Sequence, residues 1–298
     1  MVQVDLTNNC NNDCIGCWCN SPLLDDQKMK QEEKQKYLPL ELVKELLAEL
    51  STLGVREIYY AGGGEPFMHP DIMEVLKATK RKGFVCYVNT NFTLVDEKRV
   101  SELIDLGVEH LTVSVWAGNA QSYLATHPNK TEEDFCRLER NLTLLNSRKG
   151  RFPSVKIYHV ISKKNYHQME EMIAFAVRTG SESFEFTMID TIPGKTDKLL
   201  LSLEENKLLQ AQCSRIQEKR RQGLYPKGLV FFKFDQFVRR VCEEGALQGE
   251  YDRGIIGKMA CLIGWDFSRI IADGNVNGCL KAHRIPVGNM FEDRFLTI

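Results

Sequence analysis

The chain has 298 residues, of which 43% are hydrophobic and 27% are charged, and its formal net charge is −1. This composition indicates one large globular domain, or one domain with a small appendage, and the nearly balanced charge disfavours nucleic acids and anionic membranes as partners. No apolar run approaches the roughly 20 residues that span a bilayer, and the N-terminus lacks the features of a signal peptide. We therefore expect a cytoplasmic protein with no membrane partner.

Strand-like and helix-like segments alternate through the first 225 residues. Because parallel strands need crossovers of this length, the pattern predicts an α/β fold with a parallel sheet. The ligand site should then lie at the carboxyl ends of the strands, whether the sheet is open or curled into a partial barrel. Short apolar runs predict strands at 2–7, 55–61, 84–89, 109–116, 155–162 and 183–189. Apolar residues at helical spacing predict helices at 38–53, 72–81, 96–106, 132–147, 166–178 and 203–222.

The pattern changes after residue 225. Residues 229–234 are strand-like, further cysteines and glycines follow, and Asp273-Gly274 is typical of a hairpin turn. We interpret residues 1–225 as the main domain and residues 226–298 as a second, smaller unit.

The ten cysteines are not distributed as a disulfide framework, because half of them lie in two short stretches. Cys10, Cys14 and Cys17 directly follow the first predicted strand. Three thiolates on a short loop can bind three irons of a [4Fe–4S] cubane and leave the fourth iron open for S-adenosylmethionine (SAM). A zinc site is the alternative, although zinc favours four ligands and Cys19 would form a strained chelate with Cys17.

A glycine run follows the second predicted strand, and so lies at the same end of the sheet as the cysteines. Glycines allow a backbone to approach a ligand closely, and their amides and carbonyls can bind a zwitterion such as the methionine part of SAM. Alone the run could be a simple loop, but it gains specificity from the cysteines one strand earlier. The run consists of Gly62, Gly63, Gly64 and Glu65, followed by Pro66.

Together, residues 4–17 and the segment Gly63-Gly64-Glu65-Pro66 resemble the radical SAM superfamily. The resemblance implies a partial (β/α)6 barrel of the TIM type over roughly residues 1–225. It implies that Cys10, Cys14 and Cys17 bind the cluster. It also implies that the run from Gly62 to Glu65 binds the amino group of SAM.

Weaker matches to the superfamily follow the later strands. Asn89 and Asn91 lie where members often have Thr-Asn-Gly, and Ser114 matches a position that often contacts the ribose or carboxylate of SAM; polar residues closing strand ends are the alternative interpretation. The chain departs from the superfamily at Gly16, where many members have an aromatic residue before the third cysteine. Trp18 follows that cysteine instead, which leaves the contact to adenine open.

The second unit resembles the SPASM and twitch domains, which bind auxiliary iron–sulfur clusters in one branch of the superfamily. Cys261, twelve residues, Gly274, four residues and Cys279 fit their opening motif. Cys242 is a candidate for a third ligand, and the number of cysteines leaves the completeness of an auxiliary cluster open. Cys19 is a candidate hydrogen-atom donor to a substrate radical.

The resemblance implies reductive cleavage of SAM to methionine and a 5′-deoxyadenosyl radical, with flavodoxin or ferredoxin as electron donor. The radical would abstract hydrogen from a C–H bond of a sugar-like small molecule or of a peptide or protein, with net dehydrogenation or epimerisation. The absence of a leader-binding segment before the first strand favours a small molecule or an unaided protein. The alternatives are a maturase that crosslinks ribosomal peptides or proteins, and a non-catalytic iron–sulfur or zinc protein.

Overall fold

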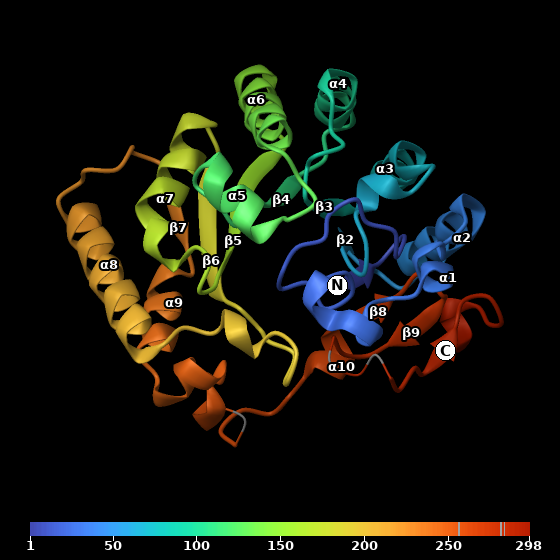
Figure 1. The fold of residues 1–298 in the computed structure, drawn as a ribbon. Helices are drawn as coiled ribbons and strands as arrows, with labels where there is room; N and C mark the ends of the chain where they lie inside the picture. The colour runs from blue at the N-terminus through green and yellow to red at the C-terminus, as the bar shows by residue number, and fades with distance from the viewer. Residues whose placement is uncertain (256, 281, 283) are drawn as a thin grey trace.

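A computed structural model describes residues 1–255, 257–280, 282 and 284–298 (Figure 1). In this part of the chain the strands form one sheet of order β10-β9-β8-β1-β2-β3-β4-β5-β6-β7. Neighbouring strands from β8 through β1 to β7 are parallel, and β9 is antiparallel to both β8 and β10. The strands are β1 (Val2–Val4), β2 (Glu57–Tyr60), β3 (Val85–Thr90), β4 (His110–Ser114), β5 (Ser154–Ile161), β6 (Ser183–Met188), β7 (Val230–Phe232), β8 (Ser268–Ile270), β9 (Asn275–Asn277) and β10 (Gly288–Asn289).

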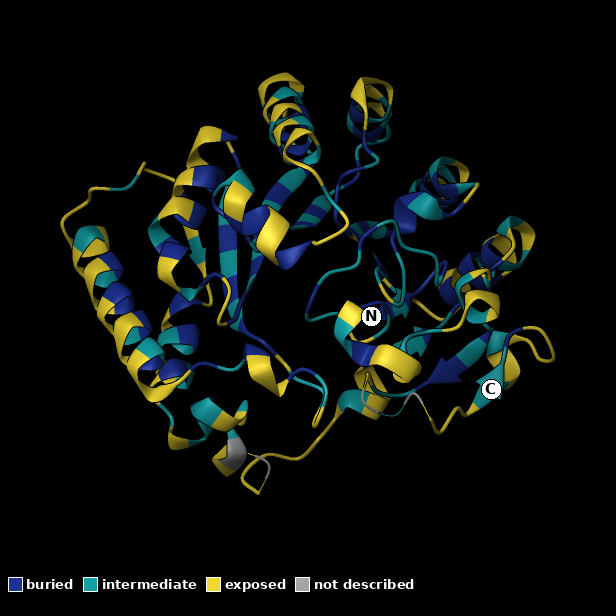
Figure 2. Cartoon of the chain, in the orientation of Figure 1, coloured by how far each residue is buried: buried dark blue, intermediate teal, exposed yellow. Residues whose placement is uncertain are grey.

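The long helices form an arc around the outside of the curved sheet, which makes the fold a partial (β/α)6 barrel (Figure 1). Their buried sides face the strands and their exposed sides face solvent (Figure 2). In the described residues, no helix is both long and apolar enough to cross a membrane. The helices are α1 (Gln31–Lys34), α2 (Leu40–Thr52), α3 (Ile72–Arg81), α4 (Glu97–Leu106), α5 (Ala120–Thr126), α6 (Glu132–Arg148), α7 (Met169–Arg178), α8 (Leu203–Arg221), α9 (Phe234–Val241) and α10 (Ile263–Asp266).

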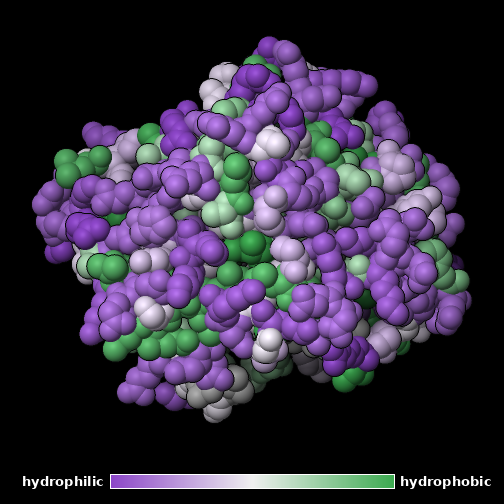
Figure 3. All heavy atoms as spheres, viewed as in Figure 1, coloured by the Kyte–Doolittle hydropathy of each residue, from purple (hydrophilic) through white to green (hydrophobic). Residues whose placement is uncertain are grey.

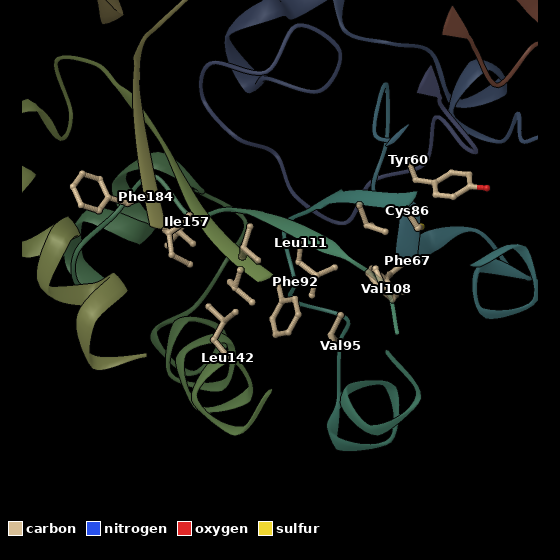
Figure 4. Packing of buried hydrophobic residues seen from close by; sticks show 14 of the residues in the cluster. Tyr60, Phe67, Cys86, Phe92, Val95, Val108, Leu111, Leu142, Ile157 and Phe184 are labelled. Carbon is tan, nitrogen blue, oxygen red and sulfur yellow. The ribbon is translucent and has the colours of Figure 1, made fainter. Parts of the chain in front are cut away.

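The hydrophobic core lies between the outer side of the sheet and the helices. Figure 4 shows Phe92, Leu111, Leu142 and Ile157 in this layer, and each of them is fully buried. Along β5, buried and partly exposed residues alternate strictly, as the two-residue period of a strand requires. The outer side of the sheet therefore supplies the packing, and the inner side remains available for polar residues.

The predicted alternation of strands and helices is confirmed, and the last long helix, expected at 203–222, is Leu203–Arg221. The hairpin expected at Asp273-Gly274 joins β8 to β9. Helix α5 is missing from the sequence prediction. Its seven residues make fewer than two full turns, too few for an apolar period to emerge, and Asn119 caps it by accepting a hydrogen bond from the amide of Ser122.

Residues 226–298 extend both edges of the sheet. Strand β7 pairs with β6, and α9 packs against α8 and β6 at that edge. At the opposite side, β8 pairs with β1, β9 pairs with β8, and β10 pairs with β9. The division of the chain near residue 225 stays a prediction.

A buried histidine lies on the outer side of β5. His159 is fully buried, and its ring packs on that of Phe186 with 5.5 Å between the centroids. Burial lowers the pKa of His159 to about 3. The unfolded chain therefore binds a proton at this residue below about pH 6.5, whereas the folded chain does not. The contribution of neutral His159 to stability is present above that pH and is lost as the pH falls.

We predict that His159→Phe weakens the acid sensitivity of the fold. Between pH 7.5 and pH 5 the wild-type chain should lose about 2 kcal/mol more unfolding free energy than the variant, because only the wild type must keep this buried imidazole neutral. Urea unfolding at the two pH values measures the difference. His167→Phe, which replaces an exposed histidine, is the control and should behave as the wild type. Equal pH dependence in wild type and His159→Phe would contradict the prediction.

Candidate functional site

A cavity of about 970 Å³ lies inside the curved sheet and reaches from the loops at the carboxyl ends of the strands down to Tyr59, Tyr87 and His110. Hydrophobic side chains gather at the centre of the molecular face viewed in Figure 3, which is mostly hydrophilic with further hydrophobic groups toward its left and upper right. The cavity brings together most of the site residues expected from the sequence. Those that line it are Cys10, Cys14, Cys17, Trp18, Gly62, Gly63, Gly64, Glu65, Asn89, Asn91 and Ser114.

The cysteine loop, residues 7–20 between β1 and the first short helical turn, contacts α5 and the turn that follows this helix. The amide of Ile15 donates to the carbonyl of Thr126 over 3.0 Å. Asn129 Oδ1 accepts from the amide of Asp13, and Asn129 Nδ2 donates to the carbonyl of Asn11, both over 3.0 Å. This support could not be predicted from a local pattern, because the contacts join segments more than 100 residues apart.

Backbone amides donate to the sulfurs of Cys10 and Cys17. Cys10 Sγ accepts from the amide of Asn12 over 3.4 Å, and Cys17 Sγ accepts from the amides of Cys19 and Asn20 over 3.4 and 3.3 Å. A hydrogen bond from the Cys19 thiol is the largest cause that lowers the pKa of Cys17 to about 6, whereas burial raises the pKa of Cys10 to about 12. Amide hydrogen bonds of this kind stabilise negative charge on sulfur.

The three thiols of the cluster motif are free, lie on one loop and line the same cavity. In the described part of the chain, no group of three or more His, Cys, Asp or Glu side chains is arranged to hold one metal ion. A cubane binds each thiolate through a different iron, so three thiolates on one loop fit an iron–sulfur cluster.

The glycine run passes so close to the chain after β1 that it has no room for side chains. A Cβ atom on Gly64 would lie 2.2 Å from the carbonyl oxygen of Asn9, and one on Gly62 would lie 1.9 Å from Cγ of Asp5. Gly62 also has a φ of 120°, which disfavours other residues. The amide of Glu65 donates to the carbonyl of Asn9 over 2.8 Å, which joins the run to the cysteine loop.

Glu65 connects the loops that follow β2 and β3. Its carboxylate is buried and accepts from Thr90 Oγ1 over 2.6 Å and from the amides of Asn91 and Phe67 over 2.7 and 3.1 Å. Burial raises the pKa of Glu65, and these donors oppose the shift. Asn91 in turn lies beside the cysteine loop, with its Nδ2 4.0 Å from Cys10 Sγ and 2.9 Å from Asn11 Oδ1.

Two tryptophans lie near the cysteine loop. Trp18 is 47% exposed at the cavity mouth, and its Nε1 donates to the carbonyl of Asp190 over 2.9 Å. Trp116 follows β4, lines the cavity and adopts a left-handed φ of 58°. A Cβ atom on Gly16 would lie 2.7 Å from Ile189 Cδ1 and 3.5 Å from Trp116 Cζ3, so the glycine before the third cysteine leaves room for Ile189, and the ring of Trp116 lies beside it. Trp116 was not predicted as a site residue, because a single aromatic residue after a strand carries no pattern.

The lower part of the cavity contains residues that the sequence did not assign to a site. Tyr59, Tyr87 and His110 occupy neighbouring strands and stack with centroid distances of 4.0 and 4.4 Å. Lys156 on β5 pairs with Glu185 on β6 over 2.5 Å. Two-residue periodicity relates the residues of one face but does not say which face is the inner one.

The other cysteines with a predicted role lie outside the cluster motif. Cys19 follows the cluster motif, and its thiol is directed to the sulfur of Cys17. Cys261 is exposed ahead of α10, and Cys279 is partly buried after β9. Cys242 follows α9 and lies near the buried Cys213 of α8. The roles assigned to these cysteines stay predictions.

The fold is a parallel partial barrel, and a three-cysteine loop and a glycine run lie together at the carboxyl ends of its strands. This combination indicates an enzyme of the iron–sulfur class. The sequence matches the radical SAM superfamily over residues 4–176. This match covers more than half of the chain, so the protein belongs to the radical SAM superfamily and is an enzyme. Membership of this superfamily supports a [4Fe–4S] cluster and SAM as its cofactors.

Curated relatives share about a quarter of the aligned residues. The chain is 25% identical over 187 residues to the tungsten-containing aldehyde ferredoxin oxidoreductase cofactor-modifying protein of Pyrococcus furiosus, covering 61% of this chain and 49% of that protein. It is 24% identical over 229 residues to the PqqA peptide cyclase of Bradyrhizobium diazoefficiens, covering 75% of this chain and 55% of the cyclase. The chain thus spans about half the length of these relatives.

Solved structures of low identity share the fold. SuiB of Streptococcus suis bound to SAM has a TM-score of 0.71 at 16% identity, covering 99% of this chain and 64% of SuiB. Native anSMEcpe with bound SAM has a TM-score of 0.70 at 14% identity, covering 99% of this chain and 79% of that chain. These similarities agree with the partial barrel described above.

We predict that Gly64→Ala disrupts the site more than it disrupts the fold. The added methyl group would collide with backbone atoms of the cysteine loop, and a misplacement of about 1 Å can lower a reaction rate by about a hundredfold. Iron content after anaerobic reconstitution and the rate of SAM cleavage should both fall. Gly150→Ala is the control, because a Cβ atom there meets no atom within 4 Å. Normal iron content and SAM cleavage in Gly64→Ala would contradict the prediction.

Proposed function

We propose that the enzyme cleaves SAM reductively inside the barrel and abstracts a hydrogen atom from a C–H bond of a substrate in the same cavity. The observation that carries this proposal is the single cavity lined by Cys10, Cys14 and Cys17 at its mouth and by the glycine run beside them. The cluster, when bound, supplies one electron to SAM, which yields methionine and the 5′-deoxyadenosyl radical that attacks the substrate. Flavodoxin or ferredoxin is the proposed source of that electron.

The residues of the chain hold and orient the cofactors in this proposal. The three cysteines bind the cluster, and backbone groups from Gly62 to Glu65 bind the amino end of SAM. Side chains that line the cavity bind the remainder of SAM: Asn89, Asn91 and Ser114 offer polar groups, and Trp18 offers an aromatic ring. Cys19 is retained as a proposed hydrogen-atom donor, although its thiol is directed to Cys17.

We propose a peptide as the substrate class. Support comes from relatives and structural neighbours whose names include PqqA peptide cyclases, SuiB bound to the precursor peptide SuiA, and anSMEcpe with bound peptides. The reaction would then be an oxidation or a crosslink within the peptide. The cavity is long enough to extend well below the cysteine loop, which leaves room for a side chain next to SAM.

A small polar molecule is the second candidate substrate. The ion pair between Lys156 and Glu185 lies on the inner side of the sheet, and Lys156 Nζ is 4.3 Å from the ring centroid of Phe232. A charged pair beside an aromatic ring suits a sugar-like metabolite with several polar groups. Peptides and polar metabolites can be compared directly by how strongly each stimulates formation of 5′-deoxyadenosine.

We predict that the anaerobically reconstituted chain binds about four irons in the cluster held by Cys10, Cys14 and Cys17, with any auxiliary cluster adding to this number, and releases 5′-deoxyadenosine when dithionite and SAM are added. Replacing the three cysteines with Ala should abolish this product, since no thiolates remain to hold the cluster. Cys136→Ala is the matched control, because Cys136 is exposed on α6. Iron and zinc analysis with chromatography of the product measures the outcome. Zinc binding without SAM cleavage would contradict the proposed function and favour a non-catalytic metal protein.

We also propose that residues 226–298 form an auxiliary-cluster unit of the SPASM or twitch type, with Cys261 and Cys279 among its ligands. The double variant Cys261→Ala, Cys279→Ala is predicted to bind less iron than the wild type while it still cleaves SAM without substrate. The reason is that these cysteines lie on elements separate from the cysteine loop. The same iron assay measures the difference, with Cys136→Ala as control. Unchanged iron content would contradict the proposal that Cys261 and Cys279 bind an auxiliary cluster.

A further inference from the structure

An ion pair joins the C-terminal part of the chain to the first strand. Strand β8 lies beside β1, and Arg269 on β8 faces Asp5, the residue that follows β1. Arg269 Nε and Nη2 both donate to Asp5 Oδ2, over 2.9 and 2.5 Å. Gln3 Nε2 donates to the other carboxylate oxygen over 2.8 Å. The contact spans 264 positions of sequence.

The carboxylate in this pair is deeply buried. Asp5 is 1% exposed and Arg269 is 18% exposed in its side chain. Burial raises the pKa of Asp5, whereas Arg269 lowers it. A buried carboxylate without a cationic partner is costly, so the charge of Asp5 depends on Arg269. Without Arg269, this carboxylate would keep only the weaker hydrogen bonds from uncharged groups such as Gln3 Nε2.

Asp5 also forms part of the surface on which the glycine run lies. A Cβ atom on Gly62 would lie 1.9 Å from Asp5 Cγ and 2.3 Å from Asp5 Oδ1, so the α-carbon of Gly62 sits directly against this carboxylate. The amide of Gly63 also donates a hydrogen bond to Asp5. The position of the carboxylate therefore sets the position of the first half of the run.

We infer that Arg269 is a positioning residue, which acts through Asp5 to hold the glycine run in the conformation that binds SAM. The identity of the ligand rests on the proposed function, whereas the coupling between Arg269 and the run rests on the contacts described above. The C-terminal part of the chain thus controls the affinity of the site for SAM without touching the cysteines of the cluster motif.

A second ion pair offers a matched control. Arg294 Nε donates to Glu49 Oε1 over 2.6 Å, and the amide of Leu296 donates to Glu49 Oε2 over 3.1 Å. This pair also joins the C-terminal part of the chain to a buried carboxylate of the main domain, but Glu49 lies on α2, outside the sheet. R294Q should therefore weaken the attachment of the C-terminal segment without moving the glycine run.

The first test is hydrogen exchange of the full chain before iron is added. In R269Q the peptide that contains Gly62 to Glu65 should exchange faster than in the wild type by roughly tenfold, because a hydrogen-bonded surface beneath it is lost. In R294Q that peptide should exchange as in the wild type, although peptides near Glu49 exchange faster. Unchanged exchange at 62–65 in R269Q would overturn the inference whether or not the chain cleaves SAM.

The second test is the dependence of 5′-deoxyadenosine formation on SAM concentration in the reconstituted enzyme. R269Q should raise KM for SAM by roughly tenfold with a much smaller change in kcat, and R269K, which keeps the positive charge, should raise it less. The double variant D5N/R269Q should recover part of the loss, because an amide pair leaves no unpaired charge. R294Q should leave KM unchanged.

The outcomes separate the two proposals. A wild-type enzyme that does not cleave SAM contradicts the proposed function, and the exchange test still decides the coupling. Equal KM values for R269Q and R294Q, with equal losses of thermal stability, would reduce Arg269 to a structural residue and overturn the inference. If R269Q does not fold, R269K and D5N/R269Q carry the same comparison against R294Q.

Discussion

The close approach of the loops after β1 and β2 is the constraint on which the site depends. Backbone atoms of the cysteine loop lie where a side chain on Gly64 would be, and the amide of Glu65 bonds directly to the carbonyl of Asn9. A bulkier residue would separate the cysteine loop from the glycine run. The cluster must pass an electron to SAM, so the two have to lie close together. This backbone contact holds the cysteine loop and the glycine run side by side.

Two buried carboxylates hold the glycine run from its two ends. Asp5 lies against Gly62 and is neutralised by Arg269, whereas Glu65 ends the run and accepts two hydrogen bonds from the end of β3 and one from the amide of Phe67 in its own loop. Burial of a carboxylate is unfavourable unless several donors surround it. The donors here come from separate strands, so satisfying each carboxylate also fixes the strand ends relative to one another.

Regular elements were predictable because their apolar periods are strong. The helix Ile72–Arg81 and the alternation along β5 follow directly from residues that must face the core. The cysteine and glycine motifs were equally visible, since each is contiguous and follows a predicted strand. Both lie at the same end of the sheet for the topological reason that parallel strands all end on one side.

Features that depend on distant contacts were not predictable. Helix α5 is short, yet it carries the carbonyl that holds the amide of Ile15. Ile189 and the ring of Trp116 lie next to Gly16, where many members of the superfamily have an aromatic residue, and no local pattern relates these positions. The pairing of Asp5 with Arg269 requires that β1 lies parallel to β8. The positions of predicted strands along the chain do not say which strands pair.

Residues 226–298 line the cavity at one edge of the sheet and contact the support of the glycine run at the other. Strand β7 places Phe232 against Lys156 at one edge, and β8 places Arg269 against Asp5 at the other. The first contact borders the cavity, and the second borders the glycine run. Changes in this part of the chain can therefore alter the cavity wall and the glycine run separately, while the cysteine loop and its support by α5 stay intact.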